Sequence, residues 1–208
     1  MRPSRASALL ALALAAAMPL SGCALGPSHT VHDPSQQAAI DRVQTYFDNL
    51  RSLRAAFTQL GPEGDAASGT AWYEPGHLSL QYDRPVRRLL VAGNGRLVVH
   101  DDATGSITRA SLDVNPLGLL LAGPVRLSGE IDVTDVREVP GALQLSMART
   151  SNPAQGLLTL MFRIGAGGTL QLTGLEAVDS HQRRTHFLLS DQQEGLALDP
   201  SLFVPPSS

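Results

Sequence analysis

The sequence contains no lysine, and all 16 of its basic residues are arginine. With 19 acidic residues the formal net charge is −3, and no basic stripe is present, which argues against nucleic acid as a partner. Aromatic residues make up only 4% of the chain, too few for a platform on which bases would stack. The single cysteine, Cys23, excludes disulfide bonds within the chain.

Recognisable catalytic motifs are also missing. The sequence has no G-x-S-x-G nucleophile elbow and no glycine-rich nucleotide loop. The six histidines are spread out and lack neighbouring cysteines or carboxylates at metal-ligand spacing. Asp101 with Asp102, and residues 179–181 (Asp-Ser-His), fall where turns are expected rather than in a catalytic arrangement. We therefore expect no enzyme, no cofactor and no metal site.

The N-terminus has the features of a bacterial export signal. Arg2 and Arg5 precede a run of alanine and leucine that falls short of the roughly 20 apolar residues of a spanning helix. The Leu-Ser-Gly-Cys that ends at Cys23 resembles a lipobox, after which the cysteine becomes an acylated N-terminus. We expect a lipoprotein signal peptide over residues 1–22 and a flexible tether over 23–32. An ordinary cleaved signal with a chance cysteine is the alternative.

Cleavage before Cys23 would remove two arginines and leave 14 − 19 = −5 as the mature net charge. This charge disfavours binding to anionic lipid headgroups by charge alone. Ala24 follows the cysteine, in place of the aspartate typical of inner-membrane retention, so we expect delivery to the outer membrane.

Residues 33–208 have the length and apolar content of one domain. Asp33, Pro34 and Gln36 form the signature of a capped helix start. The helix that follows is expected to have one apolar stripe, made of Ile40, Val43, Phe47 and Leu50. From Leu53 the apolar period changes to two, which indicates a first strand.

The stretch GTAWYEPGHLSLQYDRPVRRLLV, residues 69–91, predicts an antiparallel meander with one apolar wall. Pro75 and Gly76 reverse the chain, and Leu78, Leu80 and Tyr82 then alternate with polar residues. A second break precedes a third strand that begins at Leu89. Further strands are expected at 96–100, 106–110, 127–133, 143–147, 157–164, 170–177 and 185–189, the first of them after the Asn-Gly hairpin signal at 94–95.

Two short apolar segments have special roles in this prediction. Residues 117–122 are too short and too apolar for a solvent-exposed helix, and form either a core plug or a lid over a cavity. Residues 202–204 (Leu-Phe-Val), before two prolines, are expected to close the edge of the sheet.

The order of the capped helix, LRSLRAAFTQ, GTAWYEPGHLSLQYDRP, LLVAGNGRLVVHD, NPLGLLL, DSHQRRTHFLLS and LFVPP resembles the periplasmic lipoprotein carrier family LolA, over most of residues 40–206. The sister family LolB, an outer-membrane acceptor, shares the fold and is itself a lipoprotein. The resemblance implies a mainly β fold with a few helices: a strongly curved, incompletely closed antiparallel β-barrel covered by short lid helices.

The resemblance also implies a function and a site. Acyl chains of lipoproteins would bind in an apolar cavity, and the protein would help to localise them to the outer membrane. The implied partners are acylated lipoproteins and an inner-membrane ABC-type lipoprotein-releasing complex. The protein would contact the membrane through its N-terminal lipid, and we expect it to be a monomer. The cavity lining implied is Phe57, Leu78, Leu80, Tyr82, Leu89 and Val91, and the lid is Leu117, Leu119, Leu120 and Leu121.

Two features depart from the carrier pattern. The carrier family typically has an arginine just before the proline that corresponds to Pro75, and it fastens the lid; here Glu74 stands there, so Arg84, Arg87 or Arg88 would have to substitute. Carriers are usually soluble, whereas Cys23 suggests a tethered protein. Both features favour a LolB-like acceptor role. The alternative is a structural or interaction outer-membrane lipoprotein whose barrel is filled by its own side chains.

Overall fold

The computed structural model describes Thr30 and residues 32–206. The expected signal peptide (residues 1–22), Cys23 and most of the expected tether lie outside the described residues. Within the described part of the chain, no helix has both the length and the apolar character needed to cross a bilayer.

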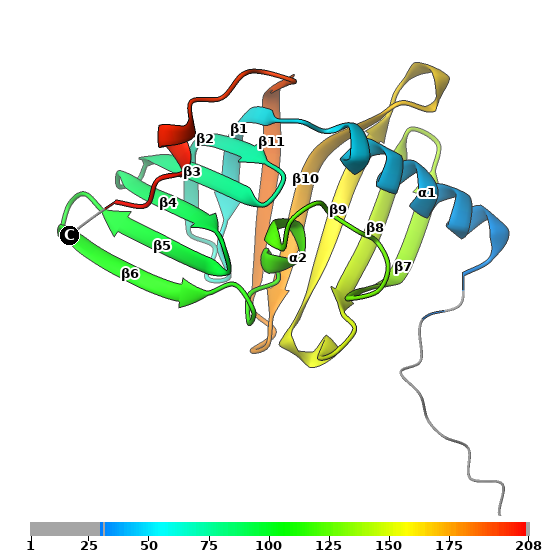
Figure 1. Ribbon diagram of the computed structural model, residues 1–208, viewed down its shortest axis with the longest axis horizontal. Helices are drawn as coiled ribbons and strands as arrows, with labels where there is room; N and C mark the ends of the chain where they lie inside the picture. Colours follow the sequence, from blue (N-terminus) through cyan, green and yellow to red (C-terminus); the bar gives the residue numbers. More distant parts are fainter. Residues whose placement is uncertain (1–29, 31, 207–208) are drawn as a thin grey trace, which may run out of the picture.

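The fold is one antiparallel sheet in which eleven strands follow the order β6-β5-β4-β3-β2-β1-β11-β10-β9-β8-β7 (Figure 1). The strands are Leu53–Leu60 (β1), Ala66–Glu74 (β2), His77–Arg84 (β3), Arg88–Gly93 (β4), Arg96–Asp101 (β5), Ser106–Ser111 (β6), Ile131–Val139 (β7), Ala142–Arg149 (β8), Gly156–Ile164 (β9), Leu170–Asp179 (β10) and Arg184–Glu194 (β11). Among the described residues no ladder joins the edge strands β6 and β7. The sheet is therefore not closed, as the resemblance to the carrier family implies.

Helix α1, Pro34–Asn49, begins with the predicted capping box. Oδ1 of Asp33 accepts hydrogen bonds from the backbone N–H groups of Ser35 and Gln36, and Oε1 of Gln36 accepts one from the N–H of Asp33. The buried face of the helix consists of Ala39, Ile40, Val43 and Phe47. The predicted amphipathic helix and its start are thus confirmed.

Helix α1 runs across the half of the sheet that contains β7 to β10 (Figure 1). Phe47 and Tyr46 meet Phe162 of β9 edge to face, with ring centroids 6.5 and 5.3 Å apart. Beneath the helix the side chains of β8 and β9 are almost inaccessible to solvent: Leu143, Leu145, Met147, Leu158 and Leu160. This half of the sheet has a filled core.

Helix α2, Gly118–Leu121, is only four residues long and belongs to the connection between β6 and β7. It lies over the middle of the sheet (Figure 1). Gly118, Leu119, Leu120 and Leu121 are all buried. The apolar segment that the sequence singles out is thus a covered helix rather than a strand.

The reversals of the chain follow the turn signals of the sequence. Asn94 and Gly95 both have left-handed backbone conformations, with φ of 52° and 74°, as a type I′ hairpin requires. Gly76, in the turn between β2 and β3, has φ of 89°. These turns fix the register of the meander.

Two predicted segments differ from the structure. Strand β7 starts at Ile131 rather than Leu127, because the backbone of Leu127 bonds to a side chain of α1 instead of entering the sheet. Residues 202–204 do not close a sheet edge. Asp199 accepts a hydrogen bond from the N–H of Ser201 and so caps a 3₁₀ helix, Pro200–Phe203 (η3), which packs against β3 and β4.

Candidate functional site

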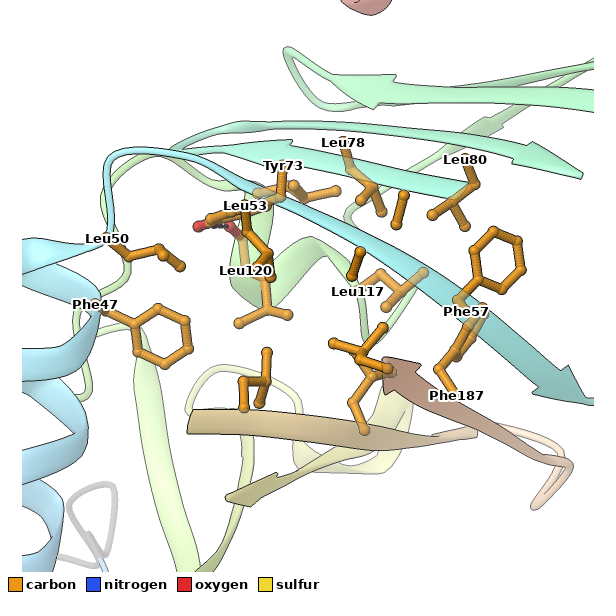
Figure 2. Close-up of a pocket in the computed structure, with 16 residues that line it drawn as sticks. Phe47, Leu50, Leu53, Phe57, Tyr73, Leu78, Leu80, Leu117, Leu120 and Phe187 are labelled. Atoms are coloured by element: carbon orange, nitrogen blue, oxygen red, sulfur yellow. Dashed lines mark hydrogen bonds between the residues drawn. The ribbon is translucent and has the colours of Figure 1, made fainter. Parts of the chain in front are cut away.

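A wholly apolar cavity of about 70 Å³ lies between the concave face of the sheet, the end of α1 and helix α2 (Figure 2). It is lined by Phe47, Leu50, Leu53, Ala55, Phe57, Ala71, Tyr73, Leu78, Leu80, Leu117, Leu120, Leu121, Leu172, Leu175, Phe187 and Leu189. Strands β1, β2, β3, β10 and β11 supply most of these residues, and α2 closes the cavity from the open side of the sheet.

Six of the ten residues predicted for the lining and lid surround this cavity: Phe57, Leu78, Leu80, Leu117, Leu120 and Leu121. Tyr82 shares the face of Leu80 but stands beside the cavity. Its ring meets Phe57 edge to face at 5.0 Å, and its hydroxyl donates to Oε1 of Gln59 at 2.7 Å. The role of these residues in binding acyl chains stays a prediction.

The placement predicted for Leu89 and Val91 is wrong, because both face away from the cavity. In the ladder between β3 and β4, Leu80 lies opposite Leu90, whereas Val91 lies opposite Ser79. Directly paired residues of an antiparallel ladder share a face, so Leu90 carries the apolar wall onward across β4. Leu89, opposite Gln81, and Val91 belong to the outer face.

Leu119 is also displaced from its predicted place. It is buried, but it lines a small depression formed with Pro116 and Gly156 on the other side of α2. A single turn of helix cannot direct four successive side chains to one side, because consecutive residues are about 100° apart. Leu119 therefore anchors α2 rather than covering the cavity.

Strands β10 and β11 contribute four lining residues that the sequence prediction did not assign to the cavity: Leu172, Leu175, Phe187 and Leu189. They reach it because β11 pairs with β1, which places Leu189 opposite Phe57. The alternation at residues 185–189 indicates the strand, but gives no information on which strand it pairs with.

Helix α2 is held by contacts on both sides. The hydroxyl of Tyr73 in β2 donates a long hydrogen bond of 3.4 Å to the carbonyl of Leu120. Beyond α2, the side-chain amide of Gln44 in α1 donates to the carbonyl of Val125 at 2.9 Å and accepts from the N–H of Leu127 at 2.8 Å. The Gln44 side chain thus donates to and accepts from the backbone, as a neighbouring strand would, and it fixes the segment that follows α2.

None of the arginines considered as substitutes at the lid hydrogen-bonds to α2 in the described residues. Nε of Arg88 donates to Oδ2 of Asp101 at 2.7 Å, and Arg84 and Arg87 form no ion pair in that part of the chain. Glu74 lies 3.5 Å from Nδ1 of His77. Instead of an arginine, Tyr73 bonds to α2 and Gln44 bonds to the segment that follows it.

Two tyrosines beside the site have strongly altered acidity. Burial raises the pKa of Tyr73 to about 12, and that of Tyr82 also to about 12. Burial and the neighbouring Glu194 carboxylate raise the pKa of Tyr46 as well. These hydroxyls stay neutral over the physiological range, as a dry apolar interior demands.

Residues 179–181 lie at the turn between β10 and β11, as expected, with Oγ of Ser180 3.4 Å from Nδ1 of His181. Asp179 accepts from the backbone N–H groups of His181 and Arg183, at 2.8 and 3.0 Å, and from the Arg183 side chain. These hydrogen bonds hold the pKa of Asp179 below its usual range, with the Arg183 side chain as the largest cause. Across the described residues, no three His, Cys, Asp or Glu side chains gather where they could hold a metal ion.

The fold and the site define a class of proteins in which an open, curved antiparallel sheet and the helices across its concave face enclose an apolar cavity. A sequence model of the family described as "Outer membrane lipoprotein carrier protein LolA" matches residues 48–206. The chain is a member of this family.

Curated relatives agree with this membership, and a solved structure shares the fold. An outer-membrane lipoprotein carrier protein of Methylococcus capsulatus is 26% identical over 177 residues, which cover 80% of this chain and 83% of that protein. One of Cupriavidus necator is 27% identical over 103 residues, covering 45% and 49%. A DUF1329 family protein of Desulfovibrio piger shares the fold, with a TM-score of 0.52 at 12% identity over 83% of this chain and 98% of that one.

Proposed function

We propose that this protein binds the acyl chains of lipoproteins between α2 and the concave face of the sheet, and helps to localise those lipoproteins to the outer membrane. The observation that carries the proposal is the wholly apolar cavity under a short helix that belongs to no strand ladder. Family membership supports it, since the relatives are named outer-membrane lipoprotein carrier proteins.

The cavity is smaller than the site that this proposal requires. The cavity measures about 70 Å³, whereas ligand sites usually measure about 300 Å³ or more. An acyl chain therefore enters only when α2 moves away. Sheltering ten to twelve methylenes would contribute roughly 8 to 10 kcal/mol before the costs of opening and association, at about 0.8 kcal/mol each.

The same small volume favours a second candidate function. A structural or interaction lipoprotein would keep its interior filled and would have no need to open. The two candidates differ in one measurable property: only a carrier or acceptor takes up a free acyl chain.

The test is binding of a fluorescent fatty acid to the mature chain and to its Ala71→Leu variant. Ala71 is buried and lines the cavity, so three added carbons fill much of its volume. We expect at least tenfold weaker binding, about 1.4 kcal/mol, with the fold retained. Ala103→Leu makes the same chemical change at an exposed turn position and is the matched control. Unchanged binding in Ala71→Leu would remove this cavity as the site.

Two further measurements address location and role. Mass spectrometry of the mature N-terminus establishes whether Cys23 carries acyl groups, which separates a tethered acceptor from a soluble shuttle. Depletion in the native host should leave other lipoproteins in the inner membrane. Normal sorting in a host without a redundant carrier would contradict the proposal.

A further inference from the structure

The outer face of the same sheet carries a second hollow, with a volume of about 290 Å³, beneath the C-terminal segment. We call it the outer groove. It is formed by His77, Val91, Gly93, Asn94, Arg96, Val98, Arg109, Phe203 and Pro205. Figure 1 shows η3, in red, beside β3 and β4 on the half of the sheet away from α1.

The floor of the outer groove is apolar. Val91 and Val98 lie opposite each other in the β4–β5 ladder and are 3% and 7% exposed. The ring of Phe203 in η3 stands 5.8 Å from the imidazole of His77 and forms a wall. These groups offer a small apolar surface bounded by rings.

A glycine keeps the outer groove open. A Cβ atom added at Gly93 would lie 2.8 Å from Cδ2 of His77 and 3.1 Å from the carbonyl oxygen of Gly76, closer than such atoms normally approach. Any other residue at position 93 would therefore displace the His77 ring and narrow the groove.

Two arginines stand at one end of the floor. Arg109 lies opposite Val98, and Arg96 precedes Val98 by two residues on the same face of β5. The two are thus diagonal neighbours, with backbones about 7 to 8 Å apart, within reach of one bound anion. Neither forms an ion pair in the described part of the chain, and the groove lining contains no carboxylate. Oε1 of Glu74 lies 3.5 Å from Nδ1 of His77.

We propose that the outer groove binds an oxyanion attached to a short apolar chain, such as the phosphate or carboxylate of an anionic amphiphile. The guanidinium groups of Arg96 and Arg109 would bind the oxyanion with charge-assisted hydrogen bonds. Val91, Val98 and Phe203 would contact the first methylenes. The site is separate from the acyl cavity, because the two lie on opposite faces of the sheet.

The test is titration of the mature chain with decyl phosphate, followed by amide NMR shifts. We expect shifts at Val91, Val98 and Phe203, and at least tenfold weaker binding to the Arg96→Gln/Arg109→Gln variant. Arg84→Gln/Arg87→Gln removes the same charge outside the groove and should bind as the unaltered chain does. Decanoate and inorganic phosphate, tested alongside, separate a phosphate headgroup, a fatty acid and a free anion as the natural source.

Three results would overturn the proposal: equal affinity in the Arg96→Gln/Arg109→Gln variant, equally tight binding of uncharged decanol, or shifts confined to residues such as Phe57 and Leu80. Gly93→Ala gives a second readout, since a narrowed groove should weaken binding without loss of charge. The Ala71→Leu variant should keep the outer groove intact, so failure of either proposal is distinguishable from failure of the other.

Discussion

The two halves of the sheet present similar aliphatic side chains to the concave face, yet one half is filled and the other is hollow. In the half that contains β7 to β9, the 16-residue helix α1 inserts Ile40 and Val43, and the strand residues beneath it are almost fully buried. In the half that contains β1 to β3, β10 and β11, the four-residue helix α2 leaves a cavity.

The difference shows that cavity formation depends on the covering helix rather than on the strands. Burying apolar side chains stabilises both halves, at roughly 25 cal/mol per Å². A long amphipathic helix supplies a complete stripe for this purpose, whereas a single turn supplies only two or three side chains. The half with the short cover is the one that retains a cavity.

The largest expected effect comes from one substitution made in both halves. Leu145→Ala beneath α1 should lower the free energy of unfolding by about 3 to 5 kcal/mol, because a close-packed site cannot collapse. Leu80→Ala, at a residue that is 4% exposed and lines the existing cavity, should cost less, about 2 to 3 kcal/mol, because Leu80 has fewer contacts to lose. Urea denaturation of both variants measures the difference. Equal losses would mean that the two halves are packed alike.

Alkaline titration should destabilise the fold through its buried tyrosines, two of which, Tyr73 and Tyr82, lie in the hollow half. Since the pKa values of Tyr73 and Tyr82 rise from about 10 in the unfolded chain to about 12 when folded, their contribution is complete below pH 10 and is lost as the pH rises through 12. The full loss is about 2 to 3 kcal/mol per tyrosine. The chain has no lysine, so no ammonium side chain obscures the measurement.

Tyr82→Phe provides the control for this titration. Thermal unfolding between pH 9 and 12 should show a shallower decline in this variant than in the unaltered chain. The same slope in both proteins would exclude Tyr82 as a source of the alkaline loss.

Gln44→Ala should release the segment that follows α2. Its two hydrogen bonds to Val125 and Leu127 would be lost, at a cost of about 1 to 2 kcal/mol. Amide hydrogen exchange over residues 117–127 should accelerate while β8 and β9 stay protected. Gln37→Ala, on the same helix but bonded only to exposed Asp41, should leave the exchange unchanged.

Tyr73→Phe should have the smallest effect. The hydrogen bond of its hydroxyl to Leu120 is 3.4 Å long, so its loss should cost under about 1 kcal/mol. Fatty-acid binding should strengthen slightly, since the closed state is weakened. A gain in fatty-acid affinity of more than about threefold would show that this hydrogen bond is the main contact that holds α2 in place.

Much of the fold follows from local signals in the sequence. The capping box at Asp33 starts α1, the Asn94-Gly95 pair fixes a hairpin, and the alternation from Leu78 to Tyr82 gives one apolar face. Each of these signals acts over a few residues and does not depend on distant partners.

The rest depends on tertiary pairing or on ambiguous patterns. The run from Leu89 to Ala92 is apolar on both faces, because the outer face is covered by η3, so its period does not reveal that Leu90 faces the cavity. The cavity residues of β10 and β11 are brought to the site by the β1–β11 ladder, which pairs the first strand of the sequence with the last. No local pattern encodes that pairing.

The strand order has a consequence for how the molecule opens. Residues 53–111 and 131–194 each form an uninterrupted meander, and the seam between them is the β1–β11 ladder; the 112–130 bridge enters no ladder. The bridge can therefore move, or even be cleaved by a protease, without breaking the pairing of any strand. A chain cleaved within residues 112–130 should stay together as two noncovalently paired fragments, with the bridge attached to the sheet at only one end.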